Sequence, residues 1–242
     1  MIVKGEWPQG EGFLRAGYQT AGRGQTGNGW ESEEGKNLLC SILVESRMTK
    51  DKGLFDLNVA VSVAVYRLIR SYVFERSGLS TLSAAVSIKW PNDIYYGDKK
   101  VAGILIENVI IGSEVKYSIA GIGLNVNQTE FCSDAPNPIS LKQIIGKDYD
   151  LDELMEQLYA EVQKALNEDV WGEYMAHLYR REGFWPFVER EVSTVPTMNA
   201  DTKAEGIFMA CIENVLPTGE IVLRDQQGKQ RIYHFKQIRY VL

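Results

Sequence analysis

The densest group of residues suited to chemistry is a glycine-rich segment, AGRGQTGNGW, at residues 21–30. Glycine lets backbone N–H groups approach a ligand closely, and a single arginine among them, Arg23, suits an anion such as phosphate or carboxylate. The spacing of Gly22 and Gly27 imitates a P-loop, but Asn28 stands where that loop needs lysine. A surface turn has the same composition, so residue types alone leave both an anion-binding loop and a plain turn open.

A second cluster places lysines beside a proline and small residues, as KWPND at residues 89–93 and DKKVAG at residues 98–103. Pro91 cannot donate to a strand ladder, so we expect it to end a strand and to present Asn92 and Asp93 at the rim. Lys100 begins an apolar strand whose small residues allow a ligand to approach, with the ammonium as a partner for a carboxylate. On spacing alone, a hairpin with solvated lysines is the simpler interpretation.

A third cluster, GIGLNV at residues 121–126, resembles part of a dinucleotide-binding fingerprint. That fingerprint needs a third glycine at position 126 and a helix after it, whereas the chain has Val126 and a strand-like pattern. Two glycines in a strand usually serve close packing. Asn125 has the right groups to read an amide or an adenine edge.

Other reactive side chains lack a supporting local pattern. His177 and His234 are interpreted as packing residues, and no serine or cysteine lies in a nucleophile motif such as G-x-S-x-G. Three cysteines and two histidines have no metal-ligand spacing, so the sequence predicts neither a metal site nor a disulfide framework.

Composition limits the class of protein. The 242 residues suffice for one large or two modest domains, and 45% hydrophobic with 24% charged residues is typical of a globular chain. Because 26 basic and 32 acidic residues give a net charge of −6, a broad nucleic-acid-binding surface is not expected. No secretory signal pattern precedes residue 12, and apolar runs fall short of a membrane span, so a cytoplasmic location is expected.

Hydrophobic patterns predict the elements that position these clusters. Strands are predicted over residues 13–19, 37–44, 86–90, 100–111 and 116–126, and a long amphipathic helix over 54–74. Asp150 and Glu153 read as a capping box that opens a helix to about residue 166, and a further helix is predicted over 170–181. Beyond residue 186 the pattern changes to short β segments: 206–215, 219–224, 231–235 and 238–242.

These elements predict an α+β chain of two domains. Residues 1–185 form a main domain, with a mixed or antiparallel sheet and helices packed on it, and residues 186–242 form a small β unit.

Taken in order, the motifs QTAGRGQTGNGW, KWPND, DKKVAGILIE and GIGLNV resemble those of the biotin protein ligases, and the likeness covers roughly residues 13–242. The resemblance implies a catalytic domain similar to the core of class II aminoacyl-tRNA synthetases, followed by a small β-barrel of the SH3 type. It implies an enzyme in a short form without a DNA-binding domain, which joins biotin to the AMP part of ATP and then transfers biotin to a lysine of a carrier domain.

The resemblance also assigns site residues. Arg23, Lys89 and Lys100 would be catalytic, holding the acyl phosphate, the phosphate charge and the biotin carboxylate. The biotin site would comprise Gln19, Arg23, Gly24, Gln25, Lys100, Ala102 and Gly103. Trp30, Lys89, Asn92 and Asn125 would contact ATP or the adenylate, with Mg²⁺ as a further counter-charge.

Two departures from the family pattern stand out. Gln25 and Asn28 replace basic residues common in the family, so the loop has one cation where others have three, and we expect it to retain the adenylate less tightly. A Ser-Thr-Asn segment that usually precedes the glycine loop is absent, as are the strand and helix around it. We expect the amino end to be truncated, which leaves an unpaired sheet edge that favours a homodimer.

The expected partner is the biotin carboxyl carrier domain of a biotin-dependent carboxylase, with no nucleic-acid or membrane partner. Two alternatives remain: a lipoate-type ligase of the same fold, and a non-catalytic protein that binds biotin or an adenylate. Pyrophosphate release with biotin would indicate the biotin ligase, and release with lipoate but not biotin would indicate the lipoate-type ligase. Biotin binding without any release would indicate the non-catalytic protein.

Overall fold

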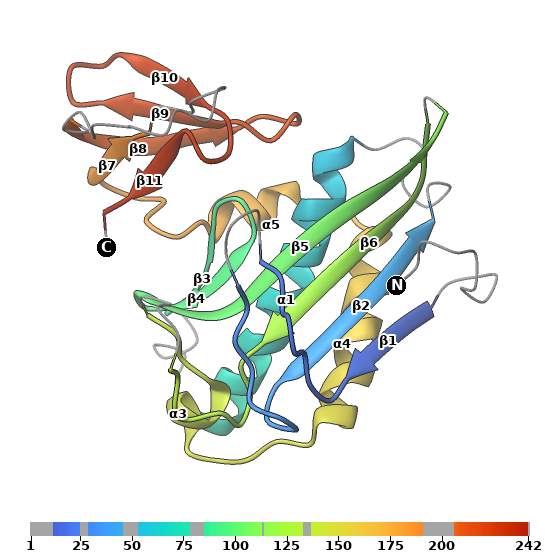
Figure 1. Ribbon diagram of the computed structural model, residues 1–242. Helices are drawn as coiled ribbons and strands as arrows, with labels where there is room; N and C mark the ends of the chain where they lie inside the picture. The colour runs from blue at the N-terminus through green and yellow to red at the C-terminus, as the bar shows by residue number, and fades with distance from the viewer. Residues whose placement is uncertain are drawn as a thin grey trace, which may run out of the picture.

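The computed structural model describes residues 12–24, 29–45, 53–77, 85–112, 114–132, 137–190 and 206–241. It contains two antiparallel sheets and a layer of helices that covers one face of the larger sheet (Figure 1). The predicted α+β class is confirmed.

The larger sheet has six strands in the order β1-β2-β6-β5-β4-β3, with every neighbouring pair antiparallel. The predicted strands appear within a few residues of their expected bounds, but the sequence patterns missed β4, a four-residue strand directly after the KWPN turn. The strands are β1 Gly12–Ala16, β2 Leu38–Glu45, β3 Val86–Lys89, β4 Asp93–Tyr96, β5 Lys99–Ile111 and β6 Glu114–Leu124.

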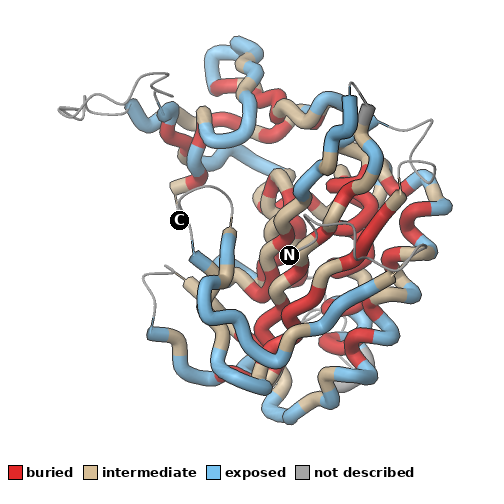
Figure 2. Tube along the Cα trace, turned by 45° about the vertical axis from the view of Figure 1, so that its right-hand side comes forward, coloured by how far each residue is buried: buried red, intermediate tan, exposed pale blue. Residues whose placement is uncertain are grey.

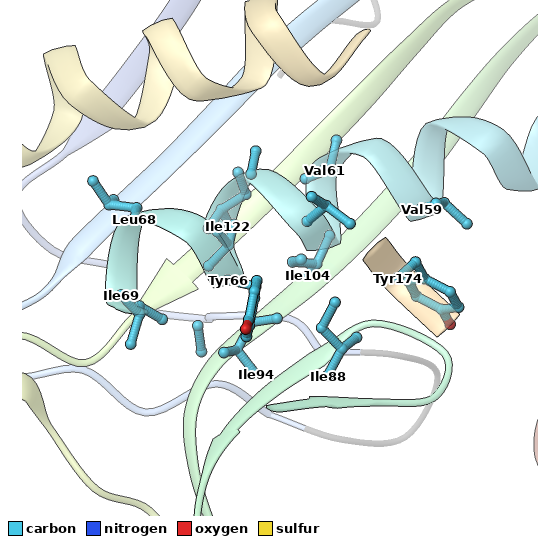
Figure 3. Close-up of a cluster of buried hydrophobic side chains, with 14 of the residues drawn as sticks. Val59, Val61, Tyr66, Leu68, Ile69, Ile88, Ile94, Ile104, Ile122 and Tyr174 are labelled. Atoms are coloured by element: carbon cyan, nitrogen blue, oxygen red, sulfur yellow. The ribbon is translucent and has the colours of Figure 1, made fainter. Parts of the chain in front are cut away.

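Helix α1 (Leu54–Ser77) forms the centre of the core. It packs on β3, β4 and β5, while α4 (Leu151–Leu166) packs beside it and on β2. Figure 3 shows Val61 and Ile69 of α1 close to Ile104 and Ile94 of the sheet, and all four are almost fully buried. Figure 2 colours the buried residues red, and they gather in the same region of the molecule.

Residues Leu54–Phe74 of α1 are long and apolar enough to cross a membrane, by length and composition alone. Within this segment, 78% of an apolar stretch of 18 residues is buried inside the molecule. Core helices of globular proteins can have the same length and composition, so the expectation that the chain has no membrane-spanning helix stays a prediction. The apolar character of α1 suits its position between a sheet and a second helix, which leaves little of its surface for water.

Helix termini follow local capping chemistry. Asp150 caps α4 as predicted, because its Oδ1 accepts the backbone N–H groups of Asp152 and Glu153 at 2.8 and 3.1 Å, but only this half of the predicted capping box is observed. A full capping box lies at α3 (Leu141–Ile145), where the Ser140 side chain accepts the Gln143 N–H and the Gln143 side chain accepts the Ser140 N–H.

The helix predicted over residues 170–181 is much shorter. Helix α5 spans Trp171–Ala176, and the chain then runs parallel to β3. Ile88 donates its N–H to the carbonyl of His177, and Tyr179 donates to the carbonyl of Ile88, both at 2.8 Å. Backbone pairing with the outer edge of β3 therefore replaces the last turns of the predicted helix.

The smaller sheet has five antiparallel strands in the order β10-β9-β8-β7-β11. Within the described residues β10 pairs only with β9 and β11 only with β7, so the predicted closed barrel is not confirmed. The strands are β7 Trp185–Glu189, β8 Ile207–Val215, β9 Ile221–Asp225, β10 Gln230–Tyr233 and β11 Ile238–Tyr240.

The packing of α4 predicts a contrast between two adjacent residues. Leu158 is fully buried in the core, whereas Gln157 is exposed. Leu158→Ala should lower the free energy of unfolding by about 2–5 kcal/mol because it leaves a cavity. Gln157→Ala, in the same helix, should change it by less than about 0.5 kcal/mol. Denaturant unfolding of both variants measures the difference, and similar losses would contradict the proposed packing.

Candidate active site

The three sequence clusters meet at one cleft of about 640 Å³ on the face of the larger sheet that α1 leaves open. The glycine-rich segment forms one wall, the strand ends of the larger sheet form the floor, and residues of the smaller sheet form the opposite wall. Eight predicted site residues line it: Gln19, Arg23, Gly24, Trp30, Lys89, Asn92, Lys100 and Gly103. The structure thus brings together residues from three separate motifs.

Two paired glycines make the floor of the cleft flat. Gly103 of β5 lies opposite Gly123 of β6, and the indole of Trp30 lies against both. A Cβ at Gly123 would stand 2.4 Å from Trp30 Cε2, and one at Gly103 would stand 2.9 Å from Trp30 Cζ3. Any side chain at either position would therefore push the ring off the floor. The Trp30 Nε1 atom is buried without a hydrogen-bond partner.

The glycine-rich segment doubles back on itself. Trp30 donates its backbone N–H to the Gly22 carbonyl at 2.9 Å, and Arg23 forms an antiparallel bridge with Gly29. A Cβ at Gly22 would lie 2.3 Å from the Trp30 carbonyl oxygen, so only glycine lets the two limbs close. The predicted site residue Gln25 and the variable Asn28 lie outside the described residues.

Two of the cations that line the cleft form ion pairs with carboxylates. Lys100 Nζ lies 2.7 Å from Asp93 Oδ1, with both side chains about one-third exposed, and 5.7 Å from the Trp30 ring. Arg23 is mostly exposed, and its Nη2 lies 3.4 Å from Glu107 Oε2. Both ion pairs join positive and negative groups that remain in contact with water, so an anionic ligand can compete for either cation.

Lys89 is the most buried of the cleft cations. Its ammonium donates to Tyr95 Oη at 3.0 Å and lies 4.7 and 5.3 Å from the ring centroids of Tyr95 and Tyr240. Burial lowers the pKa of Lys89 to about 8; Asp93 opposes that shift, and the positive charges of Lys100 and Arg180 add to it. This lysine therefore changes charge just above neutral pH.

Three predicted residues are buried, and their surroundings limit what each can contact. The Ala102 side chain is fully buried in the core beneath the sheet, so a wall for a ligand could come only from its backbone. Asn92 is buried and donates to Asn58 Oδ1 of α1 at 2.7 Å, which fixes the KWPND turn to the helix. Asn125 is not among the residues that line the cleft; it donates to the Ile139 carbonyl at 3.2 Å, and its Oδ1 is buried without a partner.

The sequence analysis missed the wall supplied by the smaller sheet. Arg190, Phe235, Lys236, Ile238, Arg239 and Tyr240 all line the cleft. These residues are far from the glycine loop along the chain and carry no local motif, so only the packing of the two sheets could reveal them. His177, which was predicted to pack, stacks on Tyr66 with ring centroids 4.6 Å apart.

The described residues do not offer a Mg²⁺ site of their own. They contain no cluster of three or more His, Cys, Asp or Glu side chains. The carboxylates among the lining residues are Asp93 and Glu107, and each is paired with a cation of the cleft. Since Mg²⁺ at nucleotide sites is usually held by substrate phosphates with one or two carboxylates, an ion in this cleft would depend on the phosphates of a bound nucleotide.

Comparison with known proteins shows which families and solved structures this chain resembles. Residues 6–125 match the sequence model of the biotin/lipoate A/B protein ligase family. A bifunctional ligase/repressor BirA of Bacillus spizizenii is 29% identical over 234 residues, covering 93% of this chain, and the chain spans 65% of that relative's length. A human biotin–protein ligase is 35% identical over 127 residues, covering 50% of this chain and 16% of the relative.

A solved biotin protein ligase of Aquifex aeolicus, in complex with biotin and ATP, has a similar fold. The TM-score is 0.70 at 23% identity, over 98% of this chain and 92% of that one. The antiparallel sheet and its helical layer are the fold that this solved structure shares. Residues 6–125 of the chain belong to the biotin/lipoate A/B protein ligase family.

The glycine floor yields a prediction that is independent of any ligand. Gly123→Ala should displace the Trp30 ring, because its Cβ would overlap the indole. In protein labelled with 5-fluorotryptophan, the ¹⁹F signal assigned to Trp30 with the Trp30→Phe variant should move, and the other tryptophan signals should stay. Gly17→Ala is the control, since a Cβ there meets nothing within 4 Å. An unmoved Trp30 signal in Gly123→Ala would contradict the contact.

Proposed function

We propose that this protein is an ATP-dependent biotin–protein ligase. The observation that carries the proposal is the cleft itself, in which a flat glycine floor is surrounded by Arg23, Lys89 and Lys100. A flat apolar ring with a carboxylate tail fits such a floor, and a polyphosphate fits the surrounding cations. The names of the relatives, which are biotin ligases, support the same substrate class.

The proposed reaction has two steps. An oxygen of the biotin carboxylate attacks the α-phosphorus of ATP, the bond to the β-phosphate oxygen breaks, and pyrophosphate leaves with that electron pair. The uncharged amine of a carrier-domain lysine then attacks the acyl carbon of biotinyl-AMP, an amide forms, and AMP leaves while the amine loses a proton. Neither step needs a nucleophilic side chain of this chain, so catalysis rests on positioning and charge.

The described residues supply that positioning. Lys100 exchanges its partner Asp93 for the biotin carboxylate, whose charge would otherwise repel the triphosphate. Gly103 and Gly123 form the floor for the bicyclic ring, and Gln19, which also lines the cleft, binds the ureido group. The Trp30 indole now occupies the floor, so it moves aside and flanks the bound adenylate. Lys89 and Arg23 offset phosphate charge.

Further parts of the proposal concern the setting of the reaction. The partner is a biotin carboxyl carrier domain, the location is cytoplasmic, and Mg²⁺ arrives with ATP because the described residues hold no site for it. Residues 1–185 act as the catalytic domain and 186–242 as a separate unit of SH3-like type. Lipoate is the competing substrate, because the matched family includes lipoate ligases.

The first prediction from this proposal concerns Lys100. Lys100→Ala should lower kcat/KM for biotin-dependent pyrophosphate release at least about 100-fold, because a charge-assisted contact to the carboxylate is lost. Lys99→Ala, an exposed neighbour, is the matched control and should retain activity. Unchanged turnover and biotin affinity in Lys100→Ala would contradict the role. Release with lipoate but not with biotin would assign the lipoate reaction instead.

The second prediction concerns pH. Because the pKa of Lys89 is lowered to about 8, its ammonium is present below that pH and is lost above it. The KM for ATP should therefore rise above pH 8, by up to about tenfold for each pH unit. Lys89→Arg keeps its charge throughout this range and should give a flat profile. The same rise in both proteins would show that another group titrates.

A further inference from the structure

The smaller sheet reaches Lys89 through a single aromatic residue, Tyr240. Tyr240 is the last residue of β11, and its ring centroid lies 5.3 Å from Lys89 Nζ. Tyr95 of β4 contributes the second ring at 4.7 Å and accepts a hydrogen bond from the ammonium through its hydroxyl. Lys89 thus lies between one ring from each sheet. We call Lys89, Tyr95 and Tyr240 the aromatic cage.

Packing inside the smaller sheet holds Tyr240 in place. Its ring lies 4.9 Å from the ring of Phe187 on β7 and 5.8 Å from that of Tyr179, and only 5% of the residue is exposed. Its hydroxyl is buried with no hydrogen-bond partner. The contact between Tyr240 and Lys89 is therefore made by the face of the ring and not by the hydroxyl.

The residue after Lys89 is also held by the smaller sheet. Trp90 donates its indole N–H to the carbonyl of Gly219 at 3.0 Å, and its ring lies 5.9 Å from that of Phe235. Gly219 has a φ of +101°, and a Cβ there would lie 2.6 Å from Phe55 at the start of α1. The first two residues of the KWPND motif therefore depend on contacts from β11 and the β8–β9 turn, which lie over that end of the larger sheet (Figure 1).

We infer that Tyr240 is a positioning residue for the proposed reaction: its ring fixes the ammonium of Lys89 in the cleft, where that ammonium meets the phosphates of ATP. The inference rests on the proposed function and deepens it. An ammonium is attracted to the faces of aromatic rings without using its N–H groups. Lysine has three donors and Tyr95 takes one, so the cage holds the charge while leaving donors for an anion.

The kinetic test replaces the ring while keeping its approximate size. Tyr240→Leu should raise the KM for ATP about tenfold and leave the KM for biotin within about twofold, because one cation contact to phosphate is misplaced. Tyr240→Phe keeps the ring and should stay within about twofold of the unaltered protein for both substrates. Tyr233→Leu, on β10 of the same sheet and outside the cleft, is the control for a lost tyrosine.

A double variant separates positioning from general packing. In the Lys89→Met background, Tyr240→Leu should raise the KM for ATP by less than about twofold, since there is no ammonium left to position. An equal rise in both backgrounds would overturn the inference, as would equal losses from Tyr240→Phe and Tyr240→Leu. If thermal melting shows that Tyr240→Leu unfolds the sheet, Tyr240→Met takes its place, because methionine fills irregular space.

A spectroscopic test requires no activity. In ¹³C-lysine-labelled protein, ring currents should shift the ε-CH₂ protons of Lys89 upfield; the Lys89→Arg variant assigns the signal. Tyr240→Leu should move this signal downfield and Tyr240→Phe should leave it in place. The Tyr95 ring keeps part of the upfield shift in both variants, so a signal that does not move at all in Tyr240→Leu overturns the inference. If the unaltered protein releases no pyrophosphate with biotin, the proposed function fails while this measurement still decides whether Tyr240 holds Lys89.

Discussion

The close approach of an indole to two adjacent backbones is the constraint on which the rest of the site depends. Gly103 and Gly123 lie opposite each other because β5 and β6 pair in a register that places them in one row. Residues that alternate with Gly103, such as Ala102 and Ile104, point into the core beneath α1. A one-residue slip would place side chains where the floor must be bare, so the hydrophobic core and the ligand site specify the same register.

Three cations beside this floor are held in two different ways. Lys100 and Arg23 each pair with a carboxylate in contact with water, whereas Lys89 is held by aromatic rings and a hydroxyl. A carboxylate partner leaves when an anion arrives, at a small cost in free energy. Aromatic rings do not compete with an anion for the N–H donors. Of these three cations, two are therefore exchangeable, and the position of the third is fixed by packing from both sheets.

Elements with a strong local sequence pattern were predicted correctly. Elements whose conformation depends on tertiary contacts were not. Helix α1 and the glycine loop have a continuous apolar period and a distinctive composition, which is why both were found. Strand β4 has only four residues, and the segment after α5 leaves helical geometry to pair with Ile88, which no local pattern encodes. Most predicted site residues line the cleft, whereas Ala102 and Asn125 are not among its lining residues, and Tyr240 was missed because it comes from the other sheet.

The composition of α1 also has a consequence for how the chain is made. During synthesis from the amino end, α1 leaves the ribosome before the elements that are its main neighbours, which all follow it in the chain: β3 to β5, α3, α4 and α5. The last of these, α5, ends at Ala176, about a hundred residues after α1. A helix as apolar as a membrane span therefore lacks part of its cover until then, and such surfaces attract chaperones and other nascent chains.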